Sequence, residues 1–146
     1  MKVTDKDIPS LIKLIFKYLN SKEYNYCIER NYEKYPNKVT GDLDLIVEEE
    51  KIKEITYKIL NIAQKKKWHS YQTYISKKNS YISLVKENYP RRFVFTIELY
   101  SEAAWKGLSY LDGKEILKNK QRYKDFWKPD AIHEATITGI HHLLYN

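Results

Sequence analysis

Hydrophobic side chains recur three and four positions apart at the start of the chain, which is the spacing of one face of an α-helix. Within this stretch Asp7 suits the N-cap position, and Pro9 is tolerated in the first turn. The apolar positions are Ile8, Leu11, Ile12, Ile15, Tyr18 and Leu19. The pattern therefore predicts an amphipathic helix over residues 7–20.

Two later stretches also have the pattern of helices. Residues 51–66 follow the acidic run 48–50, whose negative charge suits the first turn of a helix. The inner stripe of this second helix is Ile52, Ile55, Ile59, Ile62 and Ala63. The last stretch, 129–145, starts at Pro129, a residue that the first turn of a helix accepts.

Between these helices, alternating and aromatic-rich segments predict strands. In the clearest of them, 93–100, Phe95 and Ile97 face one side while Thr96 and Glu98 face the other. The predicted strands are 23–32, 41–47, 68–76, 80–87 and 93–100. The predicted connections are a loop at 33–40, a hairpin turn at 77–79, a turn at 89–92, and a short helix or two turns within 101–117.

Length and composition bound the kind of protein. With 146 residues, of which 42% are hydrophobic and 31% charged, the chain suits one globular domain with one core. Cys27 is the single cysteine, so no internal disulfide forms, and its apolar neighbours favour a buried position over a nucleophilic one. No apolar run is long enough to span a membrane and the N-terminus is too polar for a signal peptide, which makes a cytoplasmic location the expectation.

The formal net charge of +7 favours anionic partners such as nucleotides, phosphorylated sugars, nucleic acid or a membrane surface. The lysines are spread along the chain, however, and accompany fourteen tyrosines and abundant Asn and Ile. This combination is the compositional bias of an AT-rich genome. We therefore favour a solvated, scattered charge over a dedicated polyanion site.

Two carboxylates occupy one face of the predicted strand 41–47. Because side chains alternate along a strand, Asp42 and Asp44 point away from Leu43 and Leu45, and they lie about 6–7 Å apart along the backbone. Like charges at this spacing raise each other's pKa unless a cation lies between them. Rigidly held carboxylates suit an oxygen-ligated Mg²⁺ site. An edge strand with a solvated charged face remains the alternative.

Glu98 is an acidic residue within a strongly apolar strand, where it is costly unless it is paired, ligating or on a wet face. If 93–100 lies beside 41–47, Glu98 joins Asp42 and Asp44 on one surface. Three such carboxylates can hold two divalent cations for phosphoryl displacement, and Glu98 or an aspartate can act as general base. The alternative is that Glu98 faces water and pairs with a lysine.

The order of these residues resembles the nucleotidyltransferase-fold superfamily, which is DNA polymerase beta-like. The resemblance is carried by residues 41–47 (GDLDLIV) and by 97–99 (IEL). More narrowly, 28–32 (IERNY) and 105–107 (WKG) are similar to nucleotidyltransferase-like proteins associated with surface-polysaccharide genes. The likeness spans 23–117, most of the chain.

The resemblance implies an α+β fold with a small mixed β-sheet flanked by helices. It implies a single domain over 1–146, with its core in 7–117 and a C-terminal helix at about 129–145. In this interpretation Asp42 and Asp44 match the first two metal carboxylates and Glu98 the third, with Mg²⁺ or Mn²⁺ as cofactor.

The chain departs from the superfamily pattern in two ways. A Gly-Ser or Gly-Gly pair usually precedes the aspartates and cradles the triphosphate, but this chain has no glycine before Gly41. Arg30 and Asn31 occupy the corresponding place and are our candidates for phosphate contacts, together with Lys106. The third carboxylate is Glu98 where Asp is more usual, which adds one methylene of reach.

The favoured function is metal-dependent transfer of a nucleotidyl group from an NTP to a hydroxyl or phosphate acceptor. The alternative is a catalytically degenerate module that binds an anionic ligand or a partner protein. Nucleic-acid binding is a less favoured third hypothesis. The acceptor is left open, as is the presence of a homo-oligomer or a partner chain that completes the site.

Overall fold

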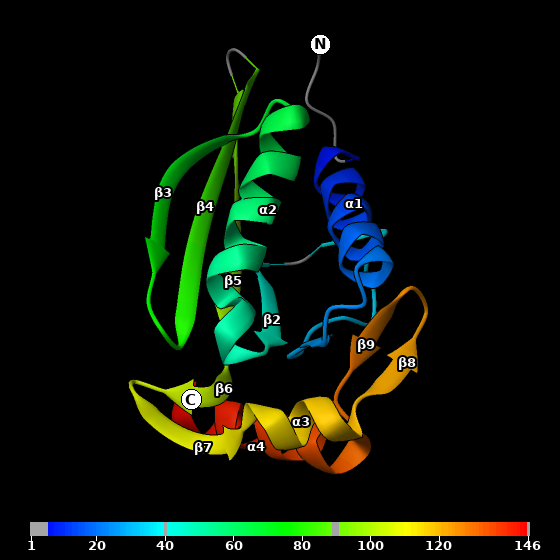
Figure 1. Cartoon of the computed structure of the whole chain (residues 1–146), viewed down its shortest axis with the longest axis vertical. Coiled ribbons are helices and arrows are strands. Elements are labelled where there is room, and N and C mark those ends of the chain that lie inside the picture. Colours follow the sequence, from blue (N-terminus) through cyan, green and yellow to red (C-terminus); the bar gives the residue numbers. More distant parts are fainter. Residues whose placement is uncertain (1–5, 40, 89–90, 146) are drawn as a thin grey trace.

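The structure, a computed structural model, describes residues 6–39, 41–88 and 91–145. Its helices alternate with short and long strands along the chain (Figure 1). The helices are α1 (Asp7–Ser21), the 3-10 turn η1 (Glu49–Lys51), α2 (Ile52–Lys65), α3 (Gly113–Asn119) and α4 (Ala131–Tyr145). The strands are β1 (Tyr26–Ile28), β2 (Leu43–Val47), β3 (His69–Ile75), β4 (Asn79–Asn88), β5 (Arg91–Tyr100), β6 (Glu102–Trp105), β7 (Leu108–Asp112), β8 (Gln121–Tyr123) and β9 (Phe126–Lys128).

The main sheet is mixed and has the strand order β1-β2-β5-β4-β3. Strands β2 and β5 run parallel, while β1–β2, β3–β4 and β4–β5 are antiparallel pairs. Two small hairpins, β6–β7 and β8–β9, form separate two-stranded sheets. The predicted α+β class, with a small mixed sheet flanked by helices, is confirmed.

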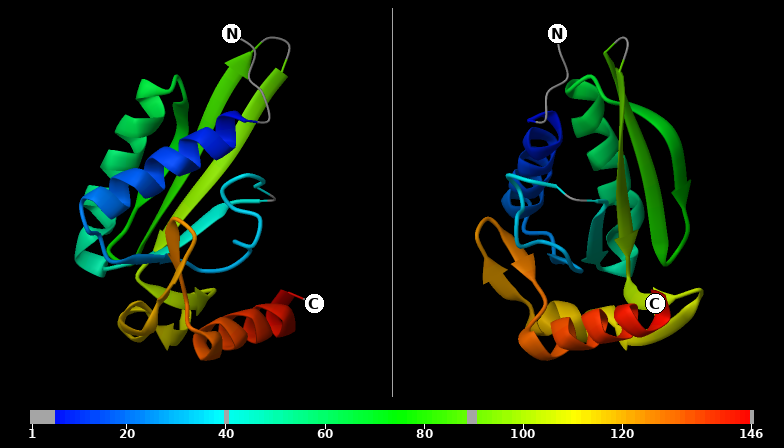
Figure 2. Two further views of the ribbon diagram at one scale, coloured as in Figure 1. Left: turned by 90° about the vertical axis from the view of Figure 1, so that its right-hand side faces the viewer. Right: turned by 180° about the vertical axis from the view of Figure 1, so that it is seen from behind.

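Helices α1 and α2 cover one face of the main sheet (Figures 1 and 2). Their predicted stripes form this core: Ile12 and Ile15 of α1, and Ile55 and Ile59 of α2, are fully buried. The sheet contributes Leu45, which is also fully buried. The spacing of the apolar residues was enough to identify the buried faces, because each helix buries its apolar stripe and exposes its polar face.

In the left view of Figure 2, β6, α3 and α4 lie together at one end of the sheet. A second apolar cluster joins these elements to the sheet. Cys27 lies in it and is fully buried, as predicted. The cluster consists of Cys27, Ile46, Ala103, Ile116, Leu117 and Ile137.

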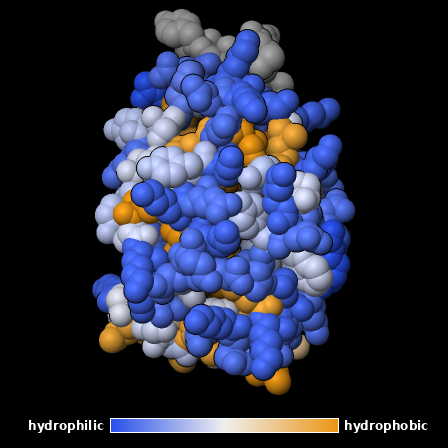
Figure 3. Space-filling model, viewed as in Figure 1, coloured by the Kyte–Doolittle hydropathy of each residue, from blue (hydrophilic) through white to orange (hydrophobic). Residues whose placement is uncertain are grey.

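The outer surfaces of α1 and α2 are largely hydrophilic, with small apolar patches between the polar side chains (Figure 3). Lys13 and Lys17 of α1 and Lys53 and Lys58 of α2 are exposed there. Lysines on the solvent faces of two separate helices agree with the prediction that the positive charge is scattered over the surface. Among the described residues, no helix is long and apolar enough to cross a membrane.

The predicted helix ends need two corrections. Asp7 is not the N-cap of α1, because that position is Lys6 and makes no side-chain cap; Asp7 instead pairs with Lys86 at 2.6 Å. The last helix begins at Ala131 rather than at Pro129. Asp130 caps it, since its carboxylate accepts hydrogen bonds from the Ile132 and His133 amides.

The predicted strand 23–32 is much shorter in the structure, where β1 spans three residues. The Glu29 amide still donates to the Asp44 carbonyl at 2.9 Å, but Asn31 then adopts a φ of +58° and the chain leaves the sheet. Asparagine is among the residues that tolerate this left-handed conformation. The loop that follows brings the chain to β2.

The two small hairpins were not predicted. The segment 101–117 was predicted to hold a short helix or two turns; α3 begins within it, and Lys106 and Gly107, which both have positive φ, form the tight turn between β6 and β7. The β8–β9 hairpin also has few residues and a partly exposed surface, so it lacks a long alternating pattern. Of the turn predicted at 89–92, Tyr89 and Pro90 lie outside the described residues, and Arg91 and Arg92 belong to β5.

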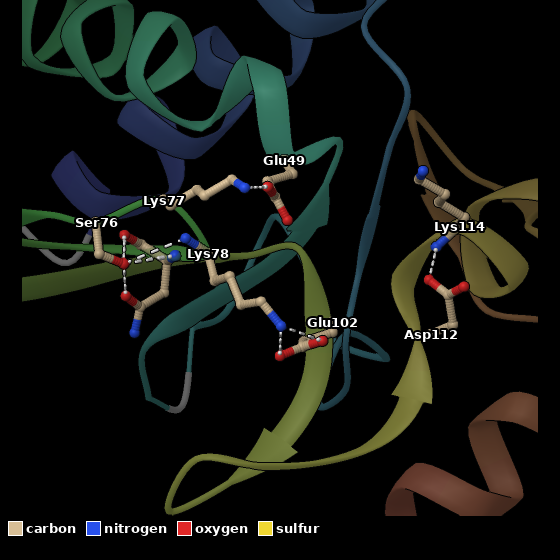
Figure 4. Close-up of polar contacts among 8 residues, drawn as sticks. Glu49, Ser76, Lys77, Lys78, Glu102, Asp112 and Lys114 are labelled. Atoms are coloured by element: carbon tan, nitrogen blue, oxygen red, sulfur yellow. Dashed lines mark hydrogen bonds and ion pairs between the residues drawn. The ribbon is translucent and has the colours of Figure 1, made fainter.

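The predicted hairpin between β3 and β4 is confirmed, and ion pairs tie its turn to neighbouring elements (Figure 4). Lys78 contacts both carboxylate oxygens of Glu102 on β6, at 3.0 and 3.2 Å. Lys77 lies 3.3 Å from the carboxylate of Glu49 in η1. Water and salt screen exposed pairs of this kind, so they orient the turn more than they stabilise the fold.

Gly113 allows the start of α3 to lie against the end of β5. A Cβ at this position would lie 1.8 Å from the Ser101 carbonyl oxygen and 2.7 Å from its carbon, both of them backbone atoms. The preceding Asp112 caps the helix by accepting a hydrogen bond from the Lys114 amide at 2.9 Å. Glycine is needed here because no larger residue fits between these backbones.

We therefore expect Gly113→Ala to lower the free energy of unfolding by about 2–3 kcal/mol, the cost of forced backbone movement. Gly139→Ala is the matched control, since nothing lies within 4 Å of its Cβ position on α4. That change is expected to be neutral or to stabilise by up to about 1 kcal/mol. Urea unfolding of the three proteins measures both values; equal effects of the two substitutions would contradict the close approach at Gly113.

Candidate active site

Parallel pairing of β2 with β5 brings two of the predicted carboxylates together. In this register Asp44 lies directly opposite Glu98, and Leu43 lies opposite Ile97. The two apolar partners are fully buried beneath α1 and α2, so Asp44 and Glu98 share the other face of the sheet. The sequence argument required these strands to be neighbours, and the structure places them side by side.

Asp42 precedes β2 by one residue and is exposed. Its negative charge is one cause of the raised pKa of both Asp44 and Glu98, so the three carboxylates act on one another. The Asp42 backbone is held from the loop by Tyr35, whose buried hydroxyl donates to the Asp42 carbonyl oxygen at 2.9 Å. This contact fixes the chain immediately before the Asp-x-Asp strand.

A fourth carboxylate, Glu29, belongs to the same cluster. Its side chain is buried, and its amide is bonded to the Asp44 carbonyl oxygen. Burial, followed by the charge of Asp44, raises the pKa of Glu29 to about 7. Sequence reasoning gave Glu29 no role, although an acidic residue beside an apolar and aromatic segment is the same signal that singled out Glu98.

Arg30 lies among these carboxylates. Its Nη2 is 3.6 Å from Oδ2 of Asp44, and its Nε is 3.8 Å from Oε2 of Glu29. The guanidinium opposes the raised pKa values of Glu29, Asp44 and Glu98. Within the described residues, no other cation is ion-paired with these carboxylates or with Asp42.

The four carboxylates of the cluster (Glu29, Asp42, Asp44 and Glu98) are paired with a single cation, Arg30, among the described residues. Burial, then the charges of Asp44 and Asp42, raise the pKa of Glu98 to about 7. Burial also raises the pKa of Asp44, with Asp42 adding to the effect and Arg30 opposing it. Carboxylates in this state favour a proton or an additional cation.

This charge imbalance, and the oxygen donors themselves, fit a hard divalent cation. As the side chains stand, no three His, Cys, Asp or Glu residues in the described part of the chain converge closely enough to hold a metal ion. The guanidinium of Arg30 already contacts Asp44, so one donor is engaged by an internal cation. Metal binding would therefore require the cluster to rearrange, and it stays a prediction.

The other two predicted phosphate ligands do not contact the carboxylates. Asn31 is exposed in the loop after β1 and makes no side-chain hydrogen bond to a described residue. Lys106 extends over the ring of Trp105, with its Nζ 4.5 Å from the ring centroid. Their roles in phosphate binding remain predictions.

An aromatic cavity of about 50 Å³ adjoins the cluster on the side of α4. Glu29 and Arg30 form one wall, and β5, β6, β7 and α4 provide the rest. Burial raises the pKa of Tyr110 in this cavity, and Glu29 adds to the effect. The other lining residues are Tyr100, Ala104, Trp105, Ile137, His141, Leu144 and Tyr145.

Two solved structures resemble this one. JHP933 from Helicobacter pylori aligns over 92% of this chain with a TM-score of 0.54 and 11% identity. The "putative nucleotidyltransferase" TM1012 from Thermotoga maritima aligns over 93% of this chain and 85% of its own, with a TM-score of 0.50 and 12% identity. The chain has a nucleotidyltransferase-like fold.

The likeness at this level of identity concerns the fold alone. The chain spans 56% of JHP933, so it matches little more than half of that protein. No protein-family model matches the sequence, and no curated protein matches it. The chemistry must therefore be argued from the site itself.

The raised pKa values predict how stability depends on pH. The carboxyl of Glu98 titrates at about 7 in the folded protein and at an ordinary 4.5 when unfolded. Because the folded state binds this proton more tightly, the stabilisation contributed by Glu98 is fully present below about pH 4.5 and is lost as the pH rises through about 7.

Between about pH 5 and pH 8 we expect the free energy of unfolding to fall by about 1 kcal/mol less in Glu98→Gln than in the native protein, a value reduced for solvent screening of a partly buried group. The measurement is urea unfolding at about pH 5 and about pH 8 without divalent cations. Glu87→Gln on β4 is the control, because that exposed carboxylate pairs with Arg92. An unchanged pH dependence in Glu98→Gln would contradict the burial and crowding of this group.

The Tyr35 hydroxyl gives a second prediction. Tyr35→Phe leaves the ring in place but removes the hydrogen bond to the Asp42 carbonyl, which we expect to cost about 1 kcal/mol of stability. Tyr57→Phe, on the exposed face of α2, should cost nothing measurable. Urea unfolding compares the two; an equal effect would show that the Tyr35 hydroxyl does not hold Asp42.

Proposed function

We propose that the protein is a metal-dependent nucleotidyltransferase that moves a nucleotidyl group from an NTP to a hydroxyl or phosphate acceptor. The observation that carries the proposal is the parallel β2–β5 pair, which sets Asp44 opposite Glu98 with Asp42 nearby. A nucleotidyltransferase-like fold supports it. A cytoplasmic location, a single domain and the likeness to proteins associated with surface-polysaccharide genes belong to the same proposal, and the acceptor stays open: a sugar phosphate or glycan precursor, a protein, or RNA.

In this proposal Asp42, Asp44 and Glu98 hold Mg²⁺ or Mn²⁺. The bound cation would neutralise triphosphate charge and lower the pKa of the attacking hydroxyl. Arg30, with Asn31 and Lys106, contacts the phosphate oxygens in the place of the missing glycine pair; a guanidinium can do so through two parallel hydrogen bonds.

Glu98 serves as the general base for a hydroxyl acceptor. A bound cation would lower the pKa of this carboxyl, so Glu98 would accept the proton as an ionised carboxylate. The acceptor oxygen forms a bond to the α-phosphorus, the bond from that phosphorus to the bridging oxygen breaks, and pyrophosphate leaves. The proton of the acceptor hydroxyl passes to Glu98.

A second candidate is a non-catalytic module that binds an anionic ligand or a partner chain. The observation that favours it is the ion pair of Arg30 with Asp44, because an arginine at this place can replace a metal ion permanently. The absence of a glycine pair before Gly41 agrees with it. The two candidates differ in whether nucleotide binding needs a divalent cation.

The test is thermal stability with Mg²⁺ or Mn²⁺, alone and with each of the four NTPs. A ligand at about 100 times its dissociation constant should stabilise the folded protein by about 2.7 kcal/mol. We expect stabilisation by one metal–NTP pair, and none in Asp44→Asn. Asp125→Asn, an exposed site in the β8–β9 turn, removes the same charge and should respond like the native protein.

Stabilisation by an NTP that ignores divalent cations would favour the binding module. An equal response of Asp44→Asn and the native protein would remove Asp44 from the site. No response to any metal or nucleotide would contradict nucleotide transfer altogether.

A further inference from the structure

Three basic side chains line a pocket beside the β8–β9 hairpin, at the C-terminal ends of α1 and α3 (Figure 1). Lys118 lies in the last turn of α3, Lys120 follows this helix, and Arg122 is the middle residue of β8. The pocket has a volume of about 540 Å³, within the usual size range of small-molecule sites. Its other lining residues are Asn20, Glu23, Tyr24, Asn25, Leu117 and Trp127.

The indole ring of Trp127 holds two of these cations. Arg122 lies opposite Trp127 in the β8–β9 hairpin, and its Cζ is 5.3 Å from the ring centroid. The Nζ of Lys120 is 5.0 Å from the same centroid. Because the face of an aromatic ring attracts cations, one tryptophan brings two like charges close together.

The hydrogen bonds of these two cations go to neutral oxygen atoms. Lys120 donates from Nζ to the side-chain oxygen of Asn25. Arg122 donates from Nε to the Lys124 carbonyl at 3.0 Å and from Nη1 to the side-chain oxygen of Asn20 at 3.5 Å. These contacts orient the two groups without neutralising them, and within the described part of the chain they leave unused N–H donors on both.

The positive charge of this pocket is not balanced by ion pairs. Among the described residues, no carboxylate lies within ion-pairing distance of Lys118, Lys120 or Arg122. Lys128 on the neighbouring strand β9, in contrast, pairs with Glu134 at 2.9 Å. Unlike the lysines on the outer faces of α1 and α2, residues 118–122 therefore concentrate cations in one place.

The chemistry of the lining matches a phosphate group joined to an organic molecule. Three basic side chains face one acidic side chain, Glu23, in the lining. A phosphate monoester carries a charge of about −1.5 to −2 near pH 7, and its three oxygens accept hydrogen bonds strongly. The apolar surface of Leu117 and the rings of Tyr24 and Trp127 are available to the organic part.

We propose that this pocket binds the phosphate monoester of a small molecule, with Lys118, Lys120 and Arg122 around the phosphate group. None of the four carboxylates of the candidate active site lines the pocket. The inference therefore goes beyond the proposed function and does not depend on it. It assigns a ligand to the basic segment 118–122, which nucleotidyl transfer leaves unexplained.

Removal of one positive charge from the pocket should weaken binding of the ester. Arg122→Gln should weaken it about tenfold or more, because hydrogen bonds to charged groups are stronger than those between neutral groups. Lys118→Gln should weaken it about threefold or more through the lost attraction alone. Lys118 is exposed and makes no hydrogen bond or ion pair with a described residue, so this second variant should fold normally.

The experiment is isothermal titration calorimetry with glucose-6-phosphate and with AMP, in buffer without divalent cations. The two esters distinguish a sugar phosphate from a nucleotide as the source of the same group, and glucose and adenosine, which lack it, should not bind. Lys17→Gln, on the exposed face of α1, is the matched control for lost charge. Asp44→Asn should bind the ester like the native protein, and a short single-stranded RNA is the polymer probe.

Several results would overturn the inference. Equal weakening in Lys17→Gln and Lys118→Gln would show that overall charge, and not the pocket, attracts the ester. Loss of ester binding in Asp44→Asn would place the ligand in the carboxylate cluster instead. Binding of the RNA but of neither ester would identify a nucleic-acid surface, and no binding of either ester would exclude the site. Because neither an NTP nor a metal is present, failure of nucleotidyl transfer leaves these results unchanged.

Discussion

The parallel pairing of β2 with β5 is the contact on which the candidate site depends. Leu43, Leu45 and their partners on β5 are buried under α1 and α2, and this apolar face determines the register. A slip by one residue would turn the leucines to solvent and the carboxylates into the core. The burial of these apolar side chains under α1 and α2 therefore also keeps Asp44 opposite Glu98.

This placement concentrates negative charge on the face of the sheet away from α1 and α2. Burial and mutual repulsion raise the pKa values of Glu29 and Glu98, and the one cation that contacts the cluster within the described residues, Arg30, balances only part of that charge. Tyr35 restrains the Asp42 backbone from the loop. Carboxyl groups with pKa values raised in this way are common at functional sites.

Prediction from the sequence succeeded where the signal was local and repeated. The stripes of α1 and α2, the hairpin between β3 and β4, and the apolar face of β5 follow from regular periodicity. It failed at the β6–β7 and β8–β9 hairpins, whose strands span three to five residues and expose much of their surface. In the site it identified Asp42, Asp44 and Glu98 as candidates and gave Arg30 a role, but it missed Glu29.

The sequence by itself determined which side chains share a face within each strand and helix, because that follows from the backbone repeat of a few residues. It also supplied the carboxylates and the lone arginine of the cluster. Only the tertiary structure decided that β2 and β5 are neighbours, that Glu29 joins Asp44, and that Arg30 contacts both. Apart from the contact between the sequence neighbours Glu29 and Arg30, these contacts join separate segments of the chain, and packing against α1 and α2 selects them over other pairings.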